Sequence, residues 1–218
     1  MRKSKTSKKS EFYDYIMGLL YKTNKDSKTI VDNNLIYQQI DKDKCKLIGY
    51  KPKSKIKPKI LIPDKIQKMQ VVSIGERAFS EVDDLEEIIL PEGLVEICPR
   101  AFSWCKNLEN VVFPSTLKSI GYWAFECCSK LFRFNKNIFE IPDNLEVLGH
   151  SSFADCYSIE KVIIGRHTKY IGNGCFAGNH KLKYVSFEKN KTVKLGTGVF
   201  YNCISLKTTS NQFNMSTI

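Results

Sequence analysis

The residues of this chain that most readily suggest chemistry are its eight cysteines and three histidines. A zinc site needs such ligands in a fixed register, commonly as C-x-x-C pairs combined with further cysteines or histidines. The chain has no C-x-x-C pair, and the neighbours Cys127 and Cys128 would point to opposite sides of the backbone. His150, His167 and His180 share no register with the cysteines. The sequence therefore predicts no metal site and no cofactor.

Four of the cysteines recur at one position of an internal repeat, three residues after a phenylalanine. They are Cys105, Cys128, Cys156 and Cys203. Because a buried thiol behaves as a small apolar side chain, we expect this column to line the core as free thiols. Strands stacked about 4.8 Å apart would also bring the cysteines close enough for vertical disulfides, which is the alternative.

No enzyme motif accompanies these residues. Gly196 and Gly198 form a G-x-G that lacks both a third glycine and the strand–helix context of a phosphate-binding loop. The chain has neither a nucleophile elbow nor a paired acidic motif. We therefore expect a protein that is not an enzyme.

The cysteine column belongs to six sequence windows that repeat at intervals of 23 to 28 residues. Each window has a phenylalanine five residues after its start and a leucine or isoleucine six residues further on. The windows begin at Ile74, Ile97, Ile120, Leu148, Ile171 and Leu195. From that leucine the chain reads L-x-x-I-x-L, as in residues 85–90, which is typical of a leucine-rich-repeat strand. Since so short a unit cannot bury its own apolar face, neighbouring units must stack.

This pattern predicts an α/β repeat fold over residues 57–209, a leucine-rich-repeat solenoid with one parallel β-sheet face. Short helical or irregular turns, formed by the I-G-x-x-A-F segments, are expected on the other face. The unit that begins at Ile120 carries five extra residues, which we place between Phe134 and Pro142. Because these include Asn135 and Lys136, they predict a surface loop.

Outside the solenoid the sequence predicts an N-terminal cap over residues 11–56, made of a short amphipathic helix and a β-hairpin. The hairpin comprises residues 35–40 and 45–50, two strand-like runs around a polar turn. A cap is needed because an open solenoid end exposes unpaired strand edges. Residues 1–10 are expected to form a disordered basic tail and residues 210–218 a C-terminal tail.

The net charge of +11 lies in residues 1–70, which hold 18 basic and 7 acidic residues, whereas the remainder is balanced. Within this region a basic strip has lysine at every second residue: Lys51, Lys53, Lys55, Lys57 and Lys59. On an extended chain these lysines share one face, where they would block edge-to-edge association. The alternative is a strip that binds nucleic acid or an acidic glycan. Nucleic acid is the less favoured partner because Tyr50 alone provides no interleaved aromatic rings.

No stretch reaches the roughly 18 apolar residues that a membrane span requires. The basic N-terminus is followed by an apolar stretch interrupted by Asp14 and Gly18, and no convincing cleavage site follows it. The sequence thus predicts no signal peptide and, on that ground, a cytoplasmic protein. It does not indicate the oligomeric state.

The third and fifth residues of each predicted strand should point outward, giving a mixed-charge row beside an apolar stripe. The candidate partner-binding residues are Glu87, Ile89, Asn110, Val112, Arg133, Lys161, Ile163 and Tyr184. Asn135 and Ser186 complete the fifth position. Exposed apolar patches on a rigid sheet often mark protein interaction sites. The alternative is that β-branched residues are simply favoured in strands.

The recurring pattern I-G-x-x-A-F-x-x-C-x-x-L-x-x-V-x-x-P-x-x-L resembles the BspA-type leucine-rich repeat. Residues 97–120 carry nearly all of it: Ile97, Ala101, Phe102, Cys105, Leu108, Val111, Pro114 and Leu117. The likeness covers about residues 57–209. It departs from the pattern at Cys98, Cys175 and Asn179 and at the five-residue insertion.

Members of that family are surface or secreted proteins of bacteria and parasitic protists, implicated in adhesion to host proteins and other cells. The resemblance therefore implies a non-enzymatic protein-binding scaffold at a cell surface. The alternative is an intracellular scaffold whose basic N-terminal third docks on nucleic acid or an anionic surface.

Overall fold

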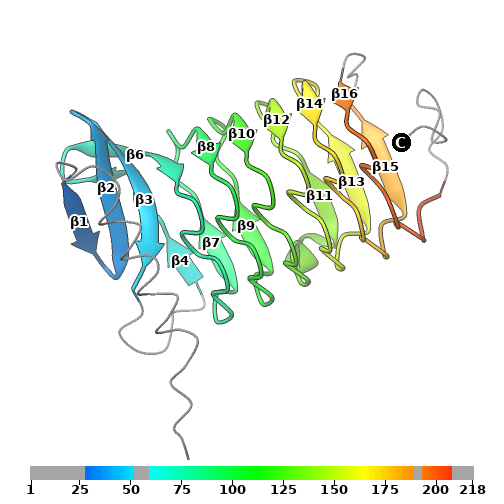
Figure 1. Ribbon diagram of the computed structural model, residues 1–218, viewed down its shortest axis with the longest axis horizontal. Helices are drawn as coiled ribbons and strands as arrows, with labels where there is room; N and C mark the ends of the chain where they lie inside the picture. The colour runs from blue at the N-terminus through cyan, green and yellow to red at the C-terminus, as the bar shows by residue number, and fades with distance from the viewer. Residues whose placement is uncertain (1–27, 52–58, 189–192, 208–218) are drawn as a thin grey trace, which may run out of the picture.

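The computed structural model describes residues 28–51, 59–188 and 193–207. The chain forms a β-solenoid of about six turns, preceded by an antiparallel hairpin at its N-terminal end (Figure 1). The predicted short helix, both terminal tails and Lys53, Lys55 and Lys57 of the basic strip lie outside the described residues.

The N-terminal cap contains three antiparallel strands, β1 (Thr29–Asp32), β2 (Leu35–Asp41) and β3 (Lys44–Tyr50). Strands β2 and β3 pair in antiparallel register around the turn at Lys42 and Asp43, which confirms the predicted hairpin. Strand β3 then pairs in parallel with β6 (Met69–Ile74), which also receives the short antiparallel strand β5 (Lys65–Ile66). The cap therefore covers the first edge of one solenoid sheet.

One face of the solenoid carries the strands predicted from the L-x-x-I-x-L pattern, in two parallel three-stranded sheets. The first sheet comprises β4 (Lys59–Leu61), β7 (Glu87–Ile89) and β9 (Asn110–Val112). The second comprises β11 (Ile138–Glu140), β13 (Lys161–Ile164) and β15 (Tyr184–Phe187). The parallel sheet face is thus present, although it is split between β9 and β11.

The other face is a second parallel sheet, which differs from the prediction of a single sheet face. Its two-residue strands end at the first residues of the repeat windows: β8 (Glu96–Ile97), β10 (Ser119–Ile120), β12 (Val147–Leu148), β14 (Tyr170–Ile171) and β16 (Lys194–Leu195). The glycine that follows lets adjacent backbones approach, because a Cβ on Gly149 would lie only 2.5 Å from the Tyr122 nitrogen.

Of the two forms predicted for the segments between the sheets, helical or irregular turns, the structure has the irregular one, because the described residues contain no α-helix. The I-G-x-x-A-F segments form irregular turns that are hydrogen-bonded to one another along the stack. For example, the Phe102 N–H donates to the Ala124 carbonyl at 2.8 Å, and the Phe125 N–H donates to the Ser152 carbonyl at 2.8 Å. Each turn is therefore joined to the next by backbone bonds outside the sheets.

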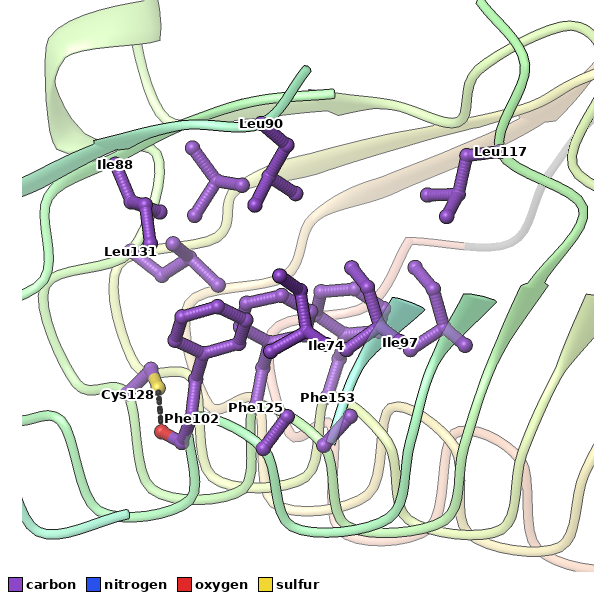
Figure 2. Close-up of a cluster of buried hydrophobic side chains, with 14 of the residues drawn as sticks. Ile74, Ile88, Leu90, Ile97, Phe102, Leu117, Phe125, Cys128, Leu131 and Phe153 are labelled. Carbon is purple, nitrogen blue, oxygen red and sulfur yellow. Dashed lines mark hydrogen bonds between the residues drawn. The ribbon is translucent and has the colours of Figure 1, made fainter. Parts of the chain in front are cut away.

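The interior is a continuous column of phenylalanines, as the period predicts. Phe102 stacks on Phe125 with ring centroids 5.0 Å apart, and Phe125 stacks on Phe153 at 5.1 Å (Figure 2). Phe79, Phe176 and Phe200 extend the same stack in both directions. Rings from successive turns bury one another, which is how a short unit obtains a core through its neighbours.

The insertion lies earlier than predicted, at residues 132–136. The Asn137 carbonyl accepts the N–H groups of Glu160 and Lys161, just as the Glu86 carbonyl accepts those of Glu109 and Asn110. Residues 133–135 form the short 3-10 helix η1 (Arg133–Asn135). Phe132 is buried and stacks on Phe139 at 4.4 Å, so part of the insertion is core rather than loop.

Candidate protein-binding face

Register in the two three-stranded sheets places the outward residues in two columns that run along the stack. The first column contains Lys59, Glu87, Asn110, Ile138, Lys161 and Tyr184. The second contains Leu61, Ile89, Val112, Glu140, Ile163 and Ser186. A polar column therefore runs beside a largely apolar one in the first sheet, with β-strand backbone holding both in place.

The polar column of the first sheet is hydrogen-bonded across strands. Glu87 Oε2 lies 3.0 Å from Lys59 Nζ, and Asn110 Nδ2 donates to Glu87 Oε1 at 3.1 Å. The hydrogen bond from Lys59 is the largest effect and lowers the pKa of Glu87 below its ordinary value; burial opposes it, and the hydrogen bond from Asn110 adds a weaker lowering. The carboxylate is therefore held ionised and fixed in orientation.

The apolar stripe beside this column comprises Leu61, Ile89 and Val112, one residue from each strand of the first sheet. Leu61 is 66% exposed and Val112 is 43% exposed, whereas Ile89 is half-buried between them. Three adjacent aliphatic side chains on a hydrogen-bonded sheet form a firm apolar surface of the kind that protein partners cover.

Seven of the eight predicted site residues lie in these columns, within β7, β9, β13 and β15. Arg133 is the exception, because it lies in η1, and Asn135 shares that position. Ile138 and Glu140 occupy the two outward positions that the sequence analysis assigned to Arg133 and Asn135. The segment Phe132-Arg133-Phe134 alternates apolar and charged residues as a strand would. This alternation explains why the sequence analysis placed Arg133 in the outward column.

The same face includes two residues that the predicted site omitted, Lys59 and Leu61. Both belong to β4, the partial repeat that precedes the first full window. The match of Ile60, Ile62 and Pro63 to the later strands was the signal that could have identified them. Of the basic strip, Lys59 pairs with Glu87, and the Lys51 N–H donates to the Asn34 carbonyl at 2.7 Å.

The cysteine column lies in the core beside the phenylalanine column and bonds each turn to the one before it. Cys128 Sγ donates to the Phe102 carbonyl at 3.1 Å, and Cys156 Sγ donates to the Phe125 carbonyl at 3.1 Å. Asn179, which replaces cysteine in this column, donates to the Phe153 carbonyl at 2.8 Å. All eight cysteines are free thiols. Burial raises the pKa of Cys105 to about 12, so the column consists of neutral donors rather than nucleophiles.

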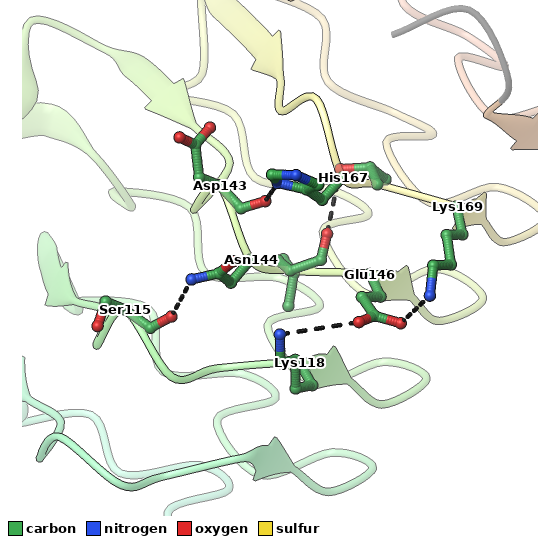
Figure 3. Close-up of polar contacts among 9 residues, drawn as sticks. Ser115, Lys118, Asp143, Asn144, Glu146, His167 and Lys169 are labelled. Carbon is green, nitrogen blue, oxygen red and sulfur yellow. Dashed lines mark hydrogen bonds and ion pairs between the residues drawn. The ribbon is translucent and has the colours of Figure 1, made fainter.

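Ion pairs also join successive turns in the segments just before the strands of the second sheet (Figure 3). The Glu146 carboxylate accepts a hydrogen bond from Lys169 Nζ, and its Oε1 lies 3.7 Å from Lys118 Nζ. One carboxylate therefore joins three turns. His167 Nδ1 lies 3.0 Å from the Asp143 carbonyl. These exposed groups therefore make contacts between successive turns.

The described residues also bear on metal sites and membrane spans. In residues 28–51, 59–188 and 193–207, no group of three or more His, Cys, Asp or Glu side chains could hold a metal ion. Within the same residues, no helix has the length and apolar character needed to cross a bilayer.

Stacked parallel strands, the phenylalanine column and the donor column define a leucine-rich-repeat solenoid. A model of the BspA type leucine rich repeat region matches residues 59–138 and 132–218, in six copies. The chain therefore belongs to the BspA-type leucine-rich repeat family. Comparison with curated protein sequences gave no match.

Several solved crystal structures share the fold. A leucine-rich repeat protein from Bacteroides ovatus is 27% identical, with a TM-score of 0.68 over 82% of this chain and 46% of that one. The leucine-rich repeat protein of T. pallidum is 22% identical, with a TM-score of 0.65 over 83% of this chain and 91% of that one. A leucine-rich cell surface protein from Faecalibacterium prausnitzii is 22% identical, with a TM-score of 0.66 over 83% of this chain and 54% of that one. The chain thus spans about half the length of two of these three proteins.

Proposed function

We propose that this protein is a non-enzymatic scaffold that binds a protein partner through the face formed by β4, β7, β9, β11, β13 and β15. The observation that carries this proposal is the exposed stripe of Leu61, Ile89 and Val112 beside the fixed Lys59–Glu87–Asn110 column. An apolar centre flanked by oriented polar groups is the usual composition of a protein interface. A rigid sheet also loses little conformational entropy when a partner docks.

We further propose that the partner is encountered at a cell surface, in an adhesive role. The support is similarity alone: one structural relative is described as a cell surface protein and another as the pneumococcal vaccine antigen PcpA. Cleavage by an added protease on intact cells, compared with lysed cells, tests exposure of the protein. Complete protection on intact cells would contradict this part of the proposal.

The binding face is tested by capture on purified extracellular matrix proteins, measured by surface plasmon resonance. Val112→Lys places a charge in the apolar stripe and should abolish capture with unchanged circular dichroism. The matched control is Val95→Lys, because Val95 is 44% exposed against 43% for Val112 and lies at the second sheet. Charge reversal at Glu87 or Lys161 should also weaken capture. Capture that survives Val112→Lys, or that Val95→Lys abolishes equally, would remove this face as the site.

A further inference from the structure

Two tryptophans lie in the irregular turns, at positions where the backbone does not favour a bulky side chain. Trp104 and Trp123 are the only tryptophans in the sequence, and their φ angles are 65° and 55°. Glycine and asparagine adopt such positive φ angles most easily, and Gly178 and Asn202 occupy the position of Trp104 in later turns. Trp104 is also 47% exposed. Neither backbone geometry nor burial therefore accounts for a tryptophan at this position.

Both tryptophans belong to one surface on two adjacent turns. The Trp123 ring meets the Tyr122 ring edge-on with centroids 5.0 Å apart, and Tyr122 is 43% exposed. From the preceding turn, Arg100 lies over the Trp123 ring, with Cζ 4.4 Å from the centroid. The Glu126 N–H donates to the Trp123 carbonyl at 3.3 Å, and the Glu126 carbonyl accepts the Trp104 N–H at 2.8 Å. The Glu126 backbone thus joins the two tryptophans. We call this surface the turn patch, which comprises Arg100, Ser103, Trp104, Tyr122, Trp123 and Glu126.

The middle of the turn patch offers both donors and acceptors of hydrogen bonds. Ser103 Oγ lies 3.5 Å from Glu126 Oε2. Burial raises the pKa of Glu126, and the nearby positive charge of Arg100 opposes that shift. The guanidinium donates, the carboxylate accepts, and the hydroxyl does both. Because Arg100 and Glu126 offset each other, the turn patch has no net charge. A ligand that fits it is therefore neutral and polar, with flat apolar faces for the rings.

Two kinds of neutral polymer present flat apolar faces to aromatic rings, proline-rich peptides and oligosaccharides. A proline-rich segment offers carbonyl acceptors but few donors, because proline has no N–H. It would cover the half-buried Glu126 carboxylate without pairing it, and an unpaired carboxylate is costly to desolvate. Sugar hydroxyls both donate and accept, so they match Glu126 and Arg100 together. The chemistry of the turn patch therefore favours an oligosaccharide.

We propose that the turn patch binds a neutral oligosaccharide whose pyranose rings carry equatorial substituents, such as β-linked glucose or N-acetylglucosamine. The C–H faces of such rings are flat and stack on the exposed Trp104 and Tyr122 rings. Arg100 holds the Trp123 ring in place between them, and hydroxyl groups of the sugar pair with Arg100 and Glu126. Aromatic side chains have few rotatable bonds, so they lose little entropy on binding. The turn patch lies outside the sheets and is distinct from the face of the proposed function.

Because Trp104 and Trp123 are the only tryptophans in the sequence, intrinsic tryptophan emission reports on the turn patch. Titration of the full chain with cellohexaose or N-acetylchitohexaose should change this emission saturably for at least one of the two sugars. Trp104→Asn should raise the dissociation constant measured by calorimetry about tenfold or more. Urea unfolding of this variant should occur at the same or a higher concentration, because asparagine suits the positive φ. The matched control is Tyr184→Thr, which removes a ring that is 48% exposed on the first face and should leave the affinity unchanged.

Several outcomes would overturn the proposal. One is an emission that neither sugar changes at millimolar concentration. Another is equal binding of decaproline, which would identify a proline-rich protein segment as the occupant. An equal loss of affinity in Tyr184→Thr would mean that the sugar binds elsewhere. Earlier urea unfolding of Trp104→Asn would mean that Trp104 has a structural role. A change of emission with protein concentration alone would identify a second copy of the chain as the occupant.

Discussion

The thiol of Cys128 donates a 3.1 Å hydrogen bond to the carbonyl oxygen of Phe102, one turn earlier in the stack. Cys105 bonds to Phe79 at 3.0 Å and Cys203 to Phe176 at 3.1 Å in the same way. One small side chain thus fills a core position and satisfies a backbone acceptor of the neighbouring turn. The cysteine column therefore stabilises the contact between turns.

Removing one of these thiols should destabilise the fold measurably. Cys128→Ala deletes a buried atom and its hydrogen bond, which should lower the free energy of unfolding by about 1–3 kcal/mol. Cys127→Ala is the matched control, because Cys127 is only half-buried. Urea unfolding followed by circular dichroism measures both. Equal effects of the two variants would show that the Cys128 hydrogen bond contributes nothing.

The phenylalanine column should be most sensitive in its middle. Phe125→Ala should cost about 3–5 kcal/mol, because a fully buried ring is lost between two neighbours. Phe200→Ala should cost less, since Phe200 is 8% exposed and, among the described residues, stacks on Phe176 alone. Thermal unfolding of the two variants tests the order. A loss below about 1 kcal/mol for Phe125→Ala would mean that the column is not core.

Thiol chemistry should follow burial. Burial raises the pKa of Cys105 to about 12 and that of Cys127 to about 11, so neither is a thiolate at neutral pH. The native protein should react slowly with an alkylating reagent, and the half-buried Cys127 should react first. After denaturation without reductant, all eight cysteines should react. Fewer than eight would restore the disulfide alternative.

Acid should release the Lys59–Glu87 contact. The pKa of Glu87 is lowered in the folded state, chiefly by the hydrogen bond from Lys59, so its ionisation stabilises the fold at neutral pH. This contribution is lost as the pH falls from the ordinary value of 4.5 through the lowered folded value. Glu87→Gln should therefore be less stable than the parent chain at neutral pH and equally stable in strong acid. Unfolding curves across that range provide the measurement.

The repeat period made the solenoid, its phenylalanine column and most outward residues predictable. Each window repeats the same buried positions. Aligning the windows correctly therefore predicts which residues of each strand point inward and which point outward. The second sheet escaped prediction because a two-residue strand such as Ser119–Ile120 shows no alternation of its own. Its pairing depends on neighbouring turns, which a local pattern does not contain.

The candidate face was predictable only where the register is unbroken. Glu87, Asn110 and Tyr184 lie in the expected outward column, but Arg133 does not, because five residues intervene after Leu131. The ion pair between Lys59 and Glu87 joins residues from successive turns. Sequence reasoning treated Lys59 as part of a separate basic strip, since no local signal connected it with Glu87.

The insertion at residues 132–136 interrupts the sheet pairing on one face of the stack. It separates the sheet of β9 from that of β11, while β10 still pairs with β12 and Phe102 still bonds to the next turn. Along this face the step from β9 to β11 is therefore not bridged by sheet pairing, and Phe113 spans it from the core side by packing against Phe125 and Phe139. A partner lying across both sheets would bridge the same step from outside.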